Sequence, residues 1–409
     1  IDSGMDVLLR GNAGSGKSTT LEMFARKRYA AREVGEEVLF LPLARFTPFD
    51  RSLVECDPLE QLCNEVARLF RSAQPGVTSQ FVREKIDASR KLALILDGVD
   101  EAGWLLGWLV KLVIRLRSLK RDALQVVASS RFDTPQLSDI GLFSIHLLPF
   151  KPEQVVGFVR NFLAGEPELA DEVTAHLRSN PVMFSVAQTP LMSTILCVLA
   201  RNGVTLPDTM NALYKERFEL LWGAYDSKKQ IRRVRSSRSC LEDVSKKVAY
   251  FLHSRRLRAS RREDILSSVV IGLKRRYRVD VIESAFLELE RPCNVLVSDH
   301  EGFLGFGHLS YQEYLAADEL YTSRQSEIVL HLSDPWWRGA LVLAAMKTDD
   351  MAEVIRERVL QSRVVGKAAD TLSAMIEVCD ESQRGVLRGL LKAQKRLDVI
   401  DGVDDDYVF

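Results

Sequence analysis

The stretch that decides the fold reads Val7-Leu8-Leu9-Arg10-Gly11-Asn12-Ala13-Gly14-Ser15-Gly16-Lys17-Ser18. A short apolar run ends at a glycine-rich loop, and helical periodicity follows from Lys17 to about Ala31. Residues 11–18 match the pattern GxxxxGK[ST], with the strand before it and the helix after it that a phosphate-binding loop requires. Glycines let the backbone curl so that its N–H groups point at phosphate, and the helix presents its positive end to the same anion.

The loop supplies the predicted ligands of ATP or ADP and of Mg²⁺. These nucleotide ligands are Gly11, Asn12, Ala13, Gly14, Ser15, Gly16, Lys17, Ser18 and Thr19. We expect Lys17 to reach the β- and γ-phosphates and the Ser18 hydroxyl to bind Mg²⁺. The alternative interpretation is a glycine-rich loop that merely turns the chain.

Strands and helices alternate through the first third of the chain. Besides residues 7–9, the expected strands are 37–43, 92–96, 124–128 and 143–148, and the expected helices are 17–31, 59–71 and 77–88. Residues 92–96 are continuously apolar, as in a parallel strand that is covered on both faces. This alternation predicts a five-stranded parallel α/β sheet with helices on both faces. Together with the phosphate-binding loop it indicates a P-loop NTPase fold, and the family resemblance given below implies that the sheet is of the additional-strand type.

An acidic cluster follows the most apolar of these strands. The run Asp97-Gly98-Val99-Asp100-Glu101 begins at the carboxyl end of the strand, the edge at which open α/β sheets bind their ligands. We expect Asp97 to hold Mg²⁺ through water, opposite Ser18. Either Glu101 or Asp100 could orient or deprotonate the attacking water. The alternative is a solvated acidic turn that caps the next helix.

A third polar group follows the strand at 124–128. It reads Ser129-Ser130-Arg131, and an arginine at this place can sense the γ-phosphate and stabilise charge on the transferring group. The alternative interpretation is an Arg131 that forms a salt bridge with a neighbouring acid. The predicted catalytic residues are therefore Lys17, Asp97, Asp100, Glu101 and Arg131.

From Pro152 onward, helical periodicity replaces the strand signal. After a P-loop domain at 1–150 we expect a helical domain at 151–225. Residues 226–325 combine three helical stretches with an apolar hairpin at 295–306, which predicts a winged-helix domain. Residues 326–409 are expected to be helical and could begin a helical sensor.

The three motifs of the first domain resemble those of the NACHT branch of the STAND P-loop NTPases, a family that includes the NOD-like receptors and bacterial antiphage proteins. The run 97–101 is the most diagnostic, because ordinary AAA+ ATPases usually show an Asp-Glu pair directly. The resemblance implies that Pro190, in Thr189-Pro190-Leu191-Met192, lies against the adenine. It also implies that His308, which precedes Leu309-Ser310-Tyr311, touches the β-phosphate of ADP. Capping of the helices that follow is the alternative role of both residues.

The resemblance implies an ATP/ADP switch with slow, Mg²⁺-dependent hydrolysis that controls homo-oligomerisation and an effector domain, in bacterial antiviral defence or innate immunity. Such proteins normally carry the effector first, so we expect this chain, which begins at Ile1, to lack it. The C-terminal region would sense an unknown ligand. Two alternatives remain: an ATP-controlled DNA-binding regulator that uses the winged helix and the basic segment 228–262, or an orthodox mechanical AAA+ ATPase.

The length and composition of the chain restrict the kinds of domain organisation, partner and metal site to expect. A chain of 409 residues is too long for one ordinary core. Lys plus Arg and Asp plus Glu are equal at 56 each, so neither nucleic acid nor an anionic membrane is an expected partner. The 6 cysteines show no CxxC spacing, which indicates reduced thiols in a cytoplasmic protein and no zinc site. The chain contains no run of 18 apolar residues, so no membrane span is predicted.

Overall fold

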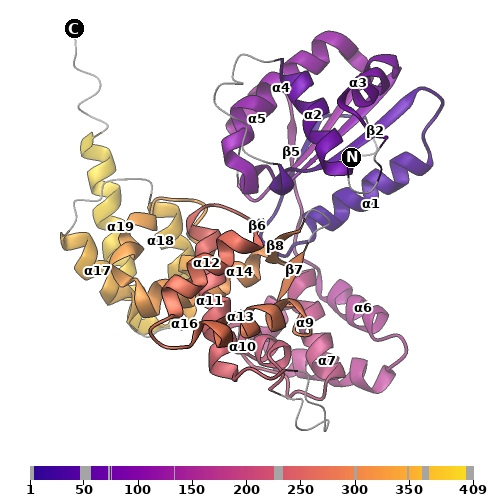
Figure 1. Ribbon diagram of the computed structural model, residues 1–409. Helices are drawn as coiled ribbons and strands as arrows, with labels where there is room; N and C mark the ends of the chain where they lie inside the picture. Colours follow the sequence, from indigo (N-terminus) through magenta and orange to yellow (C-terminus); the bar gives the residue numbers. More distant parts are fainter. Residues whose placement is uncertain are drawn as a thin grey trace. The chain divides into compact units, whose positions relative to one another are not determined.

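The chain forms two compact units in the computed structural model (Figure 1). The described residues are 4–46, 57–71, 74, 76–132, 134–224, 234–298, 302–347, 350–361 and 368–401. The first unit runs from the N-terminus to Gly203, and the second begins at Val204. The four predicted domains are a finer division of the chain than these two units, and their bounds stay a prediction.

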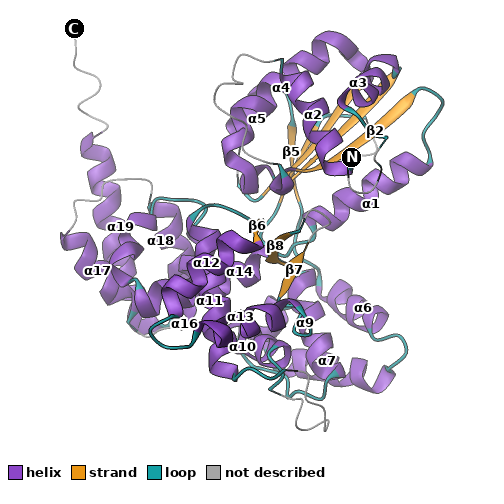
Figure 2. Cartoon of the chain, viewed as in Figure 1, coloured by secondary structure: helices purple, strands orange, loops and turns teal. Residues whose placement is uncertain are grey.

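A parallel sheet forms the centre of the first unit (Figure 2). Its strands are β1 (Val7–Arg10), β2 (Glu36–Pro42), β3 (Lys91–Asp97), β4 (Leu124–Ser130) and β5 (Phe143–His146). They lie in the order β2-β3-β4-β1-β5, and all four neighbouring pairs are parallel. Because β4 stands between β1 and β3, the sheet is of the additional-strand type. The predicted P-loop NTPase fold is confirmed.

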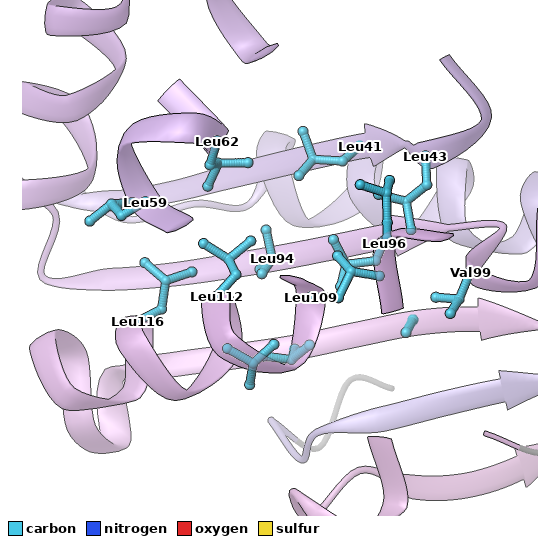
Figure 3. Close-up of a cluster of buried hydrophobic side chains, with 14 of the residues drawn as sticks. Leu41, Leu43, Leu59, Leu62, Leu94, Leu96, Val99, Leu109, Leu112 and Leu116 are labelled. Atoms are coloured by element: carbon cyan, nitrogen blue, oxygen red, sulfur yellow. The ribbon is translucent and has the colours of Figure 1, made fainter. Parts of the chain in front are cut away.

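Helices cover both faces of this sheet. They are α1 (Lys17–Ala30), α2 (Pro58–Phe70), α3 (Ser79–Ala88), α4 (Leu106–Lys120) and α5 (Pro135–Asp139), with short 3-10 turns η1 (Leu43–Arg45), η3 (Val99–Leu105) and η4 (Arg121–Ala123). On one face Leu94 of β3 packs in a cluster with Leu112 of α4 (Figure 3). On the other face Ile95 packs in a cluster with Leu21 and Phe24 of α1. Successive side chains of a strand point to opposite faces, which explains why this strand is apolar at every position.

Four more helices complete the first unit. They are α6 (Pro152–Phe162), α7 (Pro167–Ser179), α8 (Pro181–Val186) and α9 (Pro190–Arg201). Each of them begins with a proline, whose fixed φ suits the first helical position and whose missing N–H costs no intrahelical bond there. The predicted change from strands to helices at Pro152 is therefore observed.

The second unit is mainly helical. Its elements are α10 (Met210–Leu221), α11 (Arg238–Ser254), β6 (Ala259–Arg261), α12 (Arg262–Leu273), α13 (Val279–Glu290), β7 (Leu296–Ser298), β8 (Phe303–Phe306), α14 (Leu309–Ser323), η6 (Gln325–Glu327), α15 (Ile328–His331), α16 (Arg338–Lys347), α17 (Met351–Gln361), α18 (Ala369–Val378) and α19 (Glu381–Asp401). In the described part of the chain, no helix combines the length and the apolar character that crossing a bilayer requires.

A small antiparallel sheet in this unit has the order β6-β8-β7. The hairpin of β7 and β8 was expected, although its turn residues 299–301 lie outside the described residues. The third strand, β6, was missed because three residues are too few for an alternating pattern to show. Three helices with this sheet are the elements that a winged helix contains, and that assignment stays a prediction.

Leu94 offers a test of the core, because its side chain is fully buried at the centre of the sheet. Leu94→Ala should lower the free energy of unfolding by about 2–5 kcal/mol, since the deleted methyl groups leave a cavity. Urea denaturation followed by tryptophan fluorescence measures the change. The matched control is Ile114→Ala on α4, which is 53% exposed and should stay within about 0.5 kcal/mol of wild type. Equal losses in both variants would contradict the described core.

Candidate functional site

The phosphate-binding loop joins β1 to α1, and the predicted ligands 11–19 lie between the end of that strand and the first helical turn. Gly14 and Gly16 adopt φ values of +74° and +91°, where any side chain would be strained. A Cβ added to Gly14 would also come within 2.9 Å of the Cβ of Leu191. Conformation and packing therefore both require glycine at this position.

The Lys17 ammonium folds back onto the loop. Its Nζ donates to the carbonyl oxygens of Gly11, at 2.7 Å, and Asn12, at 3.1 Å. Burial lowers the pKa of Lys17; the carboxylates of Asp100, Glu101 and Asp97 act against this shift, and Arg131 acts with it. A phosphate oxygen carries charge and is a stronger acceptor than a peptide carbonyl, so a bound phosphate can draw the ammonium away from the loop.

Ser18 and Asp97 meet although 79 positions separate them in the chain. The Ser18 Oγ donates to the Asp97 Oδ1 over 3.1 Å. A hydroxyl and a carboxylate are oxygen ligands of the kind that Mg²⁺ prefers, so this pair fits the metal that the fold implies. Among the described residues, no group of three or more His, Cys, Asp and Glu side chains could hold an ion. Phosphate and water would therefore complete the coordination of Mg²⁺.

Asp100 and Arg131 form a buried ion pair. The backbone N–H of Arg131 donates to one carboxylate oxygen of Asp100 at 2.9 Å, and its Nε donates to the other at 2.6 Å. The side chain of Arg131 is only 8% exposed, and that of Asp100 only 4%. The salt bridge weighed for Arg131 from the sequence is thus present, with Asp100 as its acid. Catalytic roles of these two residues stay predictions.

Glu101 follows Asp100 and ends the turn that comes after β3. Gly98, with a φ of +78°, starts this turn, and its carbonyl accepts the N–H of Glu101 at 3.0 Å. A Cβ on Gly98 would lie 3.5 Å from the carboxyl carbon of Glu101, so that side chain folds back over the glycine. Its negative charge raises the pKa of Lys17 and so opposes the lowering caused by burial.

A small pocket of about 30 Å³ lies beside the loop. It is lined by Asn12, Ser15, Leu147, Leu148, Pro149, Gln188, Thr189 and Pro190. The N–H of Leu191 donates to the carbonyl of Gly14 at 3.3 Å, so the start of α9 is hydrogen-bonded to the loop. Pro190, predicted to contact adenine, therefore lies at the phosphate loop. The sequence analysis did not identify Gln188 or the residues after β5 as lining of this pocket. The available signal was that open α/β sheets bind ligands at the carboxyl ends of their strands, where these residues after β5 lie.

His308 lies in the second unit and caps α14. Its Nδ1 accepts the N–H of Ser310 at 3.1 Å. The neutral ring then carries its proton on Nε2, which can donate to an acceptor such as phosphate. The capping role weighed from the sequence is present, and the predicted contact with ADP stays a prediction.

The first third of the chain matches a known domain family. Residues 6–166 match the model of the NACHT domain. A comparison with curated protein sequences gives no match.

Among solved structures, the chain is similar to the Signal Transduction ATPase with Numerous Domains (STAND) protein with a tetratricopeptide repeat sensor from Pyrococcus horikoshii. The identity is 14%, the match covers 96% of this chain and 54% of that chain, and the TM-score is 0.38. A second similar structure is the Orc1 protein of Aeropyrum pernix in complex with DNA, at 13% identity, 78% and 88% coverage and a TM-score of 0.31. The chain spans about half the length of the Pyrococcus STAND protein.

Removal of the Asp100 carboxylate tests the buried ion pair. Asp100→Ala should lower the free energy of unfolding by about 3–5 kcal/mol, because it leaves the Arg131 guanidinium buried without its acid. Glu101→Gln is the control, since it keeps the size of a neighbouring acid and should cost no more than about 1 kcal/mol. Chemical denaturation of both variants measures the difference. Equal losses would mean that the pair adds nothing to stability.

Proposed function

Because residues 6–166 form a NACHT domain, a P-loop NTPase domain, we propose that this chain is an ATP/ADP-binding switch of the STAND kind with slow, Mg²⁺-dependent hydrolysis. The observation that carries the proposal is the hydrogen bond between Ser18 and Asp97. It joins the phosphate-binding loop to the acidic end of β3, so that the oxygens needed for a metal–triphosphate complex lie together. A loop that merely turned the chain would not require this partner.

Residues 11–19 hold the phosphates in this proposal. The positive end of α1 attracts the anion, and the Lys17 ammonium exchanges its two carbonyl acceptors for phosphate oxygens. Bound Mg²⁺ would offset the charge of the β- and γ-phosphates, with Ser18 and Asp97 as its protein ligands. Pro190 and the pocket beside it take the adenine.

Glu101 is the proposed residue that orients the attacking water. Both carboxylate oxygens of Asp100 accept hydrogen bonds from Arg131, so the proposed role of Asp100 is to hold the guanidinium in position. Arg131 stabilises charge on the transferring phosphate. Its own charge is partly balanced by the adjacent acid, and this weakens the stabilisation and supports slow turnover.

The proposed switch requires that ATP and ADP favour different arrangements of the chain. A nucleotide shifts the population only by the difference in its affinity for the two states. His308 is the proposed ligand of the ADP β-phosphate. Its Nδ1 accepts the helix-capping hydrogen bond, so the ring proton is on Nε2, which can donate to a phosphate oxygen. ATP would release this contact, allow homo-oligomerisation and activate an effector domain, after the C-terminal region has sensed a ligand. The setting in antiviral defence or innate immunity rests on the resemblance alone.

Ion pairs formed by described arginines of the basic segment weaken the DNA-binding alternative. Arg262 pairs with Glu290 and Arg256 with Asp334, and residues 228–233 lie outside the described part of the chain. A cation already paired with an acid contributes less to phosphate binding. Steeply salt-dependent binding to duplex DNA would nevertheless favour that alternative, and rapid steady-state hydrolysis would favour a mechanical ATPase.

Lys17→Ala tests nucleotide binding. The variant removes a charged donor to the phosphates, so its affinity for ATP should fall by about 100-fold or more. Titration with a fluorescent ATP analogue measures the affinity. The control is Lys27→Ala, on the exposed side of the same helix, which should bind as wild type does. Normal binding by Lys17→Ala would show that the loop has been wrongly assigned.

Glu101→Gln separates binding from hydrolysis. The amide keeps the shape of the carboxylate but cannot accept a proton, so single-turnover hydrolysis should slow by about 10²- to 10⁴-fold while ATP affinity stays close to wild type. Release of radiolabelled phosphate from a pre-bound complex measures the rate. If Glu101→Gln hydrolysed ATP at the wild-type rate, another group would have to accept the proton of the attacking water.

A further inference from the structure

Ser129 connects two parts of the site that the motifs do not link. Its side chain is 1% exposed, and its Oγ donates to the Oδ1 of Asp97 at 2.7 Å. The same Oγ accepts the backbone N–H of Gly98 at 2.9 Å. Leu96 pairs with Ala128 in the register of β3 and β4, so Asp97 and Ser129 are the next residues on adjacent strands.

These two bonds restrict both the carboxylate and the turn after it. A serine hydroxyl has one hydrogen to donate, and Ser129 donates it to Asp97. The oxygen of Asp97 that accepts it also accepts from Ser18 at 3.1 Å, so the carboxylate is held facing the phosphate-binding loop. The bond to Gly98 fixes the residue whose carbonyl accepts the N–H of Glu101.

We propose that Ser129 is a positioning residue for the metal side of the nucleotide site. It orients the carboxylate of Asp97 toward Ser18 and fixes the glycine turn that carries Glu101. This inference rests on the proposed function, because it concerns the same site. Partners that hydrogen-bond to a metal-binding carboxylate commonly change metal affinity about 10- to 100-fold when they are removed.

The adjacent Ser130 provides a matched control. It is equally buried on the same strand, at 1% exposure, and a neighbouring residue of a strand points to the opposite face. Its Oγ accepts from the N–H of Phe132 at 3.2 Å and from the Thr134 hydroxyl at 3.4 Å. Ser130→Ala therefore removes a buried hydroxyl from β4 without removing a bond to Asp97.

The experiment measures the affinity of the full chain for a fluorescent ATP analogue as a function of Mg²⁺ concentration, and again in EDTA. Ser129→Ala should raise the Mg²⁺ concentration for half-maximal enhancement of binding about 10- to 100-fold, and leave affinity in EDTA within about twofold of wild type. Ser129→Thr keeps the hydroxyl and should restore the wild-type Mg²⁺ dependence. Ser130→Ala should also match wild type.

Three results would overturn the inference. One is a wild-type Mg²⁺ dependence in Ser129→Ala, which leaves the proposed function standing. Another is an equal loss of affinity with Mg²⁺ and in EDTA, which indicates a purely structural role. The third is a wild-type chain that binds no nucleotide, which overturns the proposed function as well. If Ser129→Ala does not fold, Ser129→Cys takes its place, because a thiol keeps similar volume but bonds weakly, and the same shift is expected.

Discussion

The hydrogen bond between Ser18 and Asp97 is the contact on which the rest of the site depends. It exists because β1 and β3 run parallel and end at the same edge of the sheet, with β4 between them. The phosphate-binding loop follows β1, the acidic run follows the apolar part of β3, and Ser129 lies on β4 next to Asp97. A change in strand order would separate all three groups, even if each motif kept its own local shape.

Charged side chains are held close together at this edge of the sheet. Asp100 holds the guanidinium of Arg131 in a buried ion pair, and Lys17 lies within the field of both. Because burial lowers the pKa of Lys17, its positive charge is costly to keep there, and a bound phosphate would stabilise it. Such a site is adapted to hold an anion.

The loop is also in direct contact with one of the helices that follow the sheet. The carbonyl of Gly14 accepts the N–H of Leu191, and the same glycine has no room for a side chain against that leucine. The loop and the start of α9 therefore pack directly against each other within the first unit.

The sequence by itself determined the phosphate-binding loop, the five strands and the position of Asp97, because each depends on residues that are neighbours in the chain. It left open whether Arg131 pairs with an acid. It named Ser129 only as part of a polar run, without its bond to Asp97, and it did not reveal β6 or the pocket lining at Gln188. The tertiary structure decided these points, because they depend on which strands become neighbours. Asp97 and Ser129 are 32 positions apart, and only the insertion of β4 beside β3 brings their oxygens within hydrogen-bonding distance.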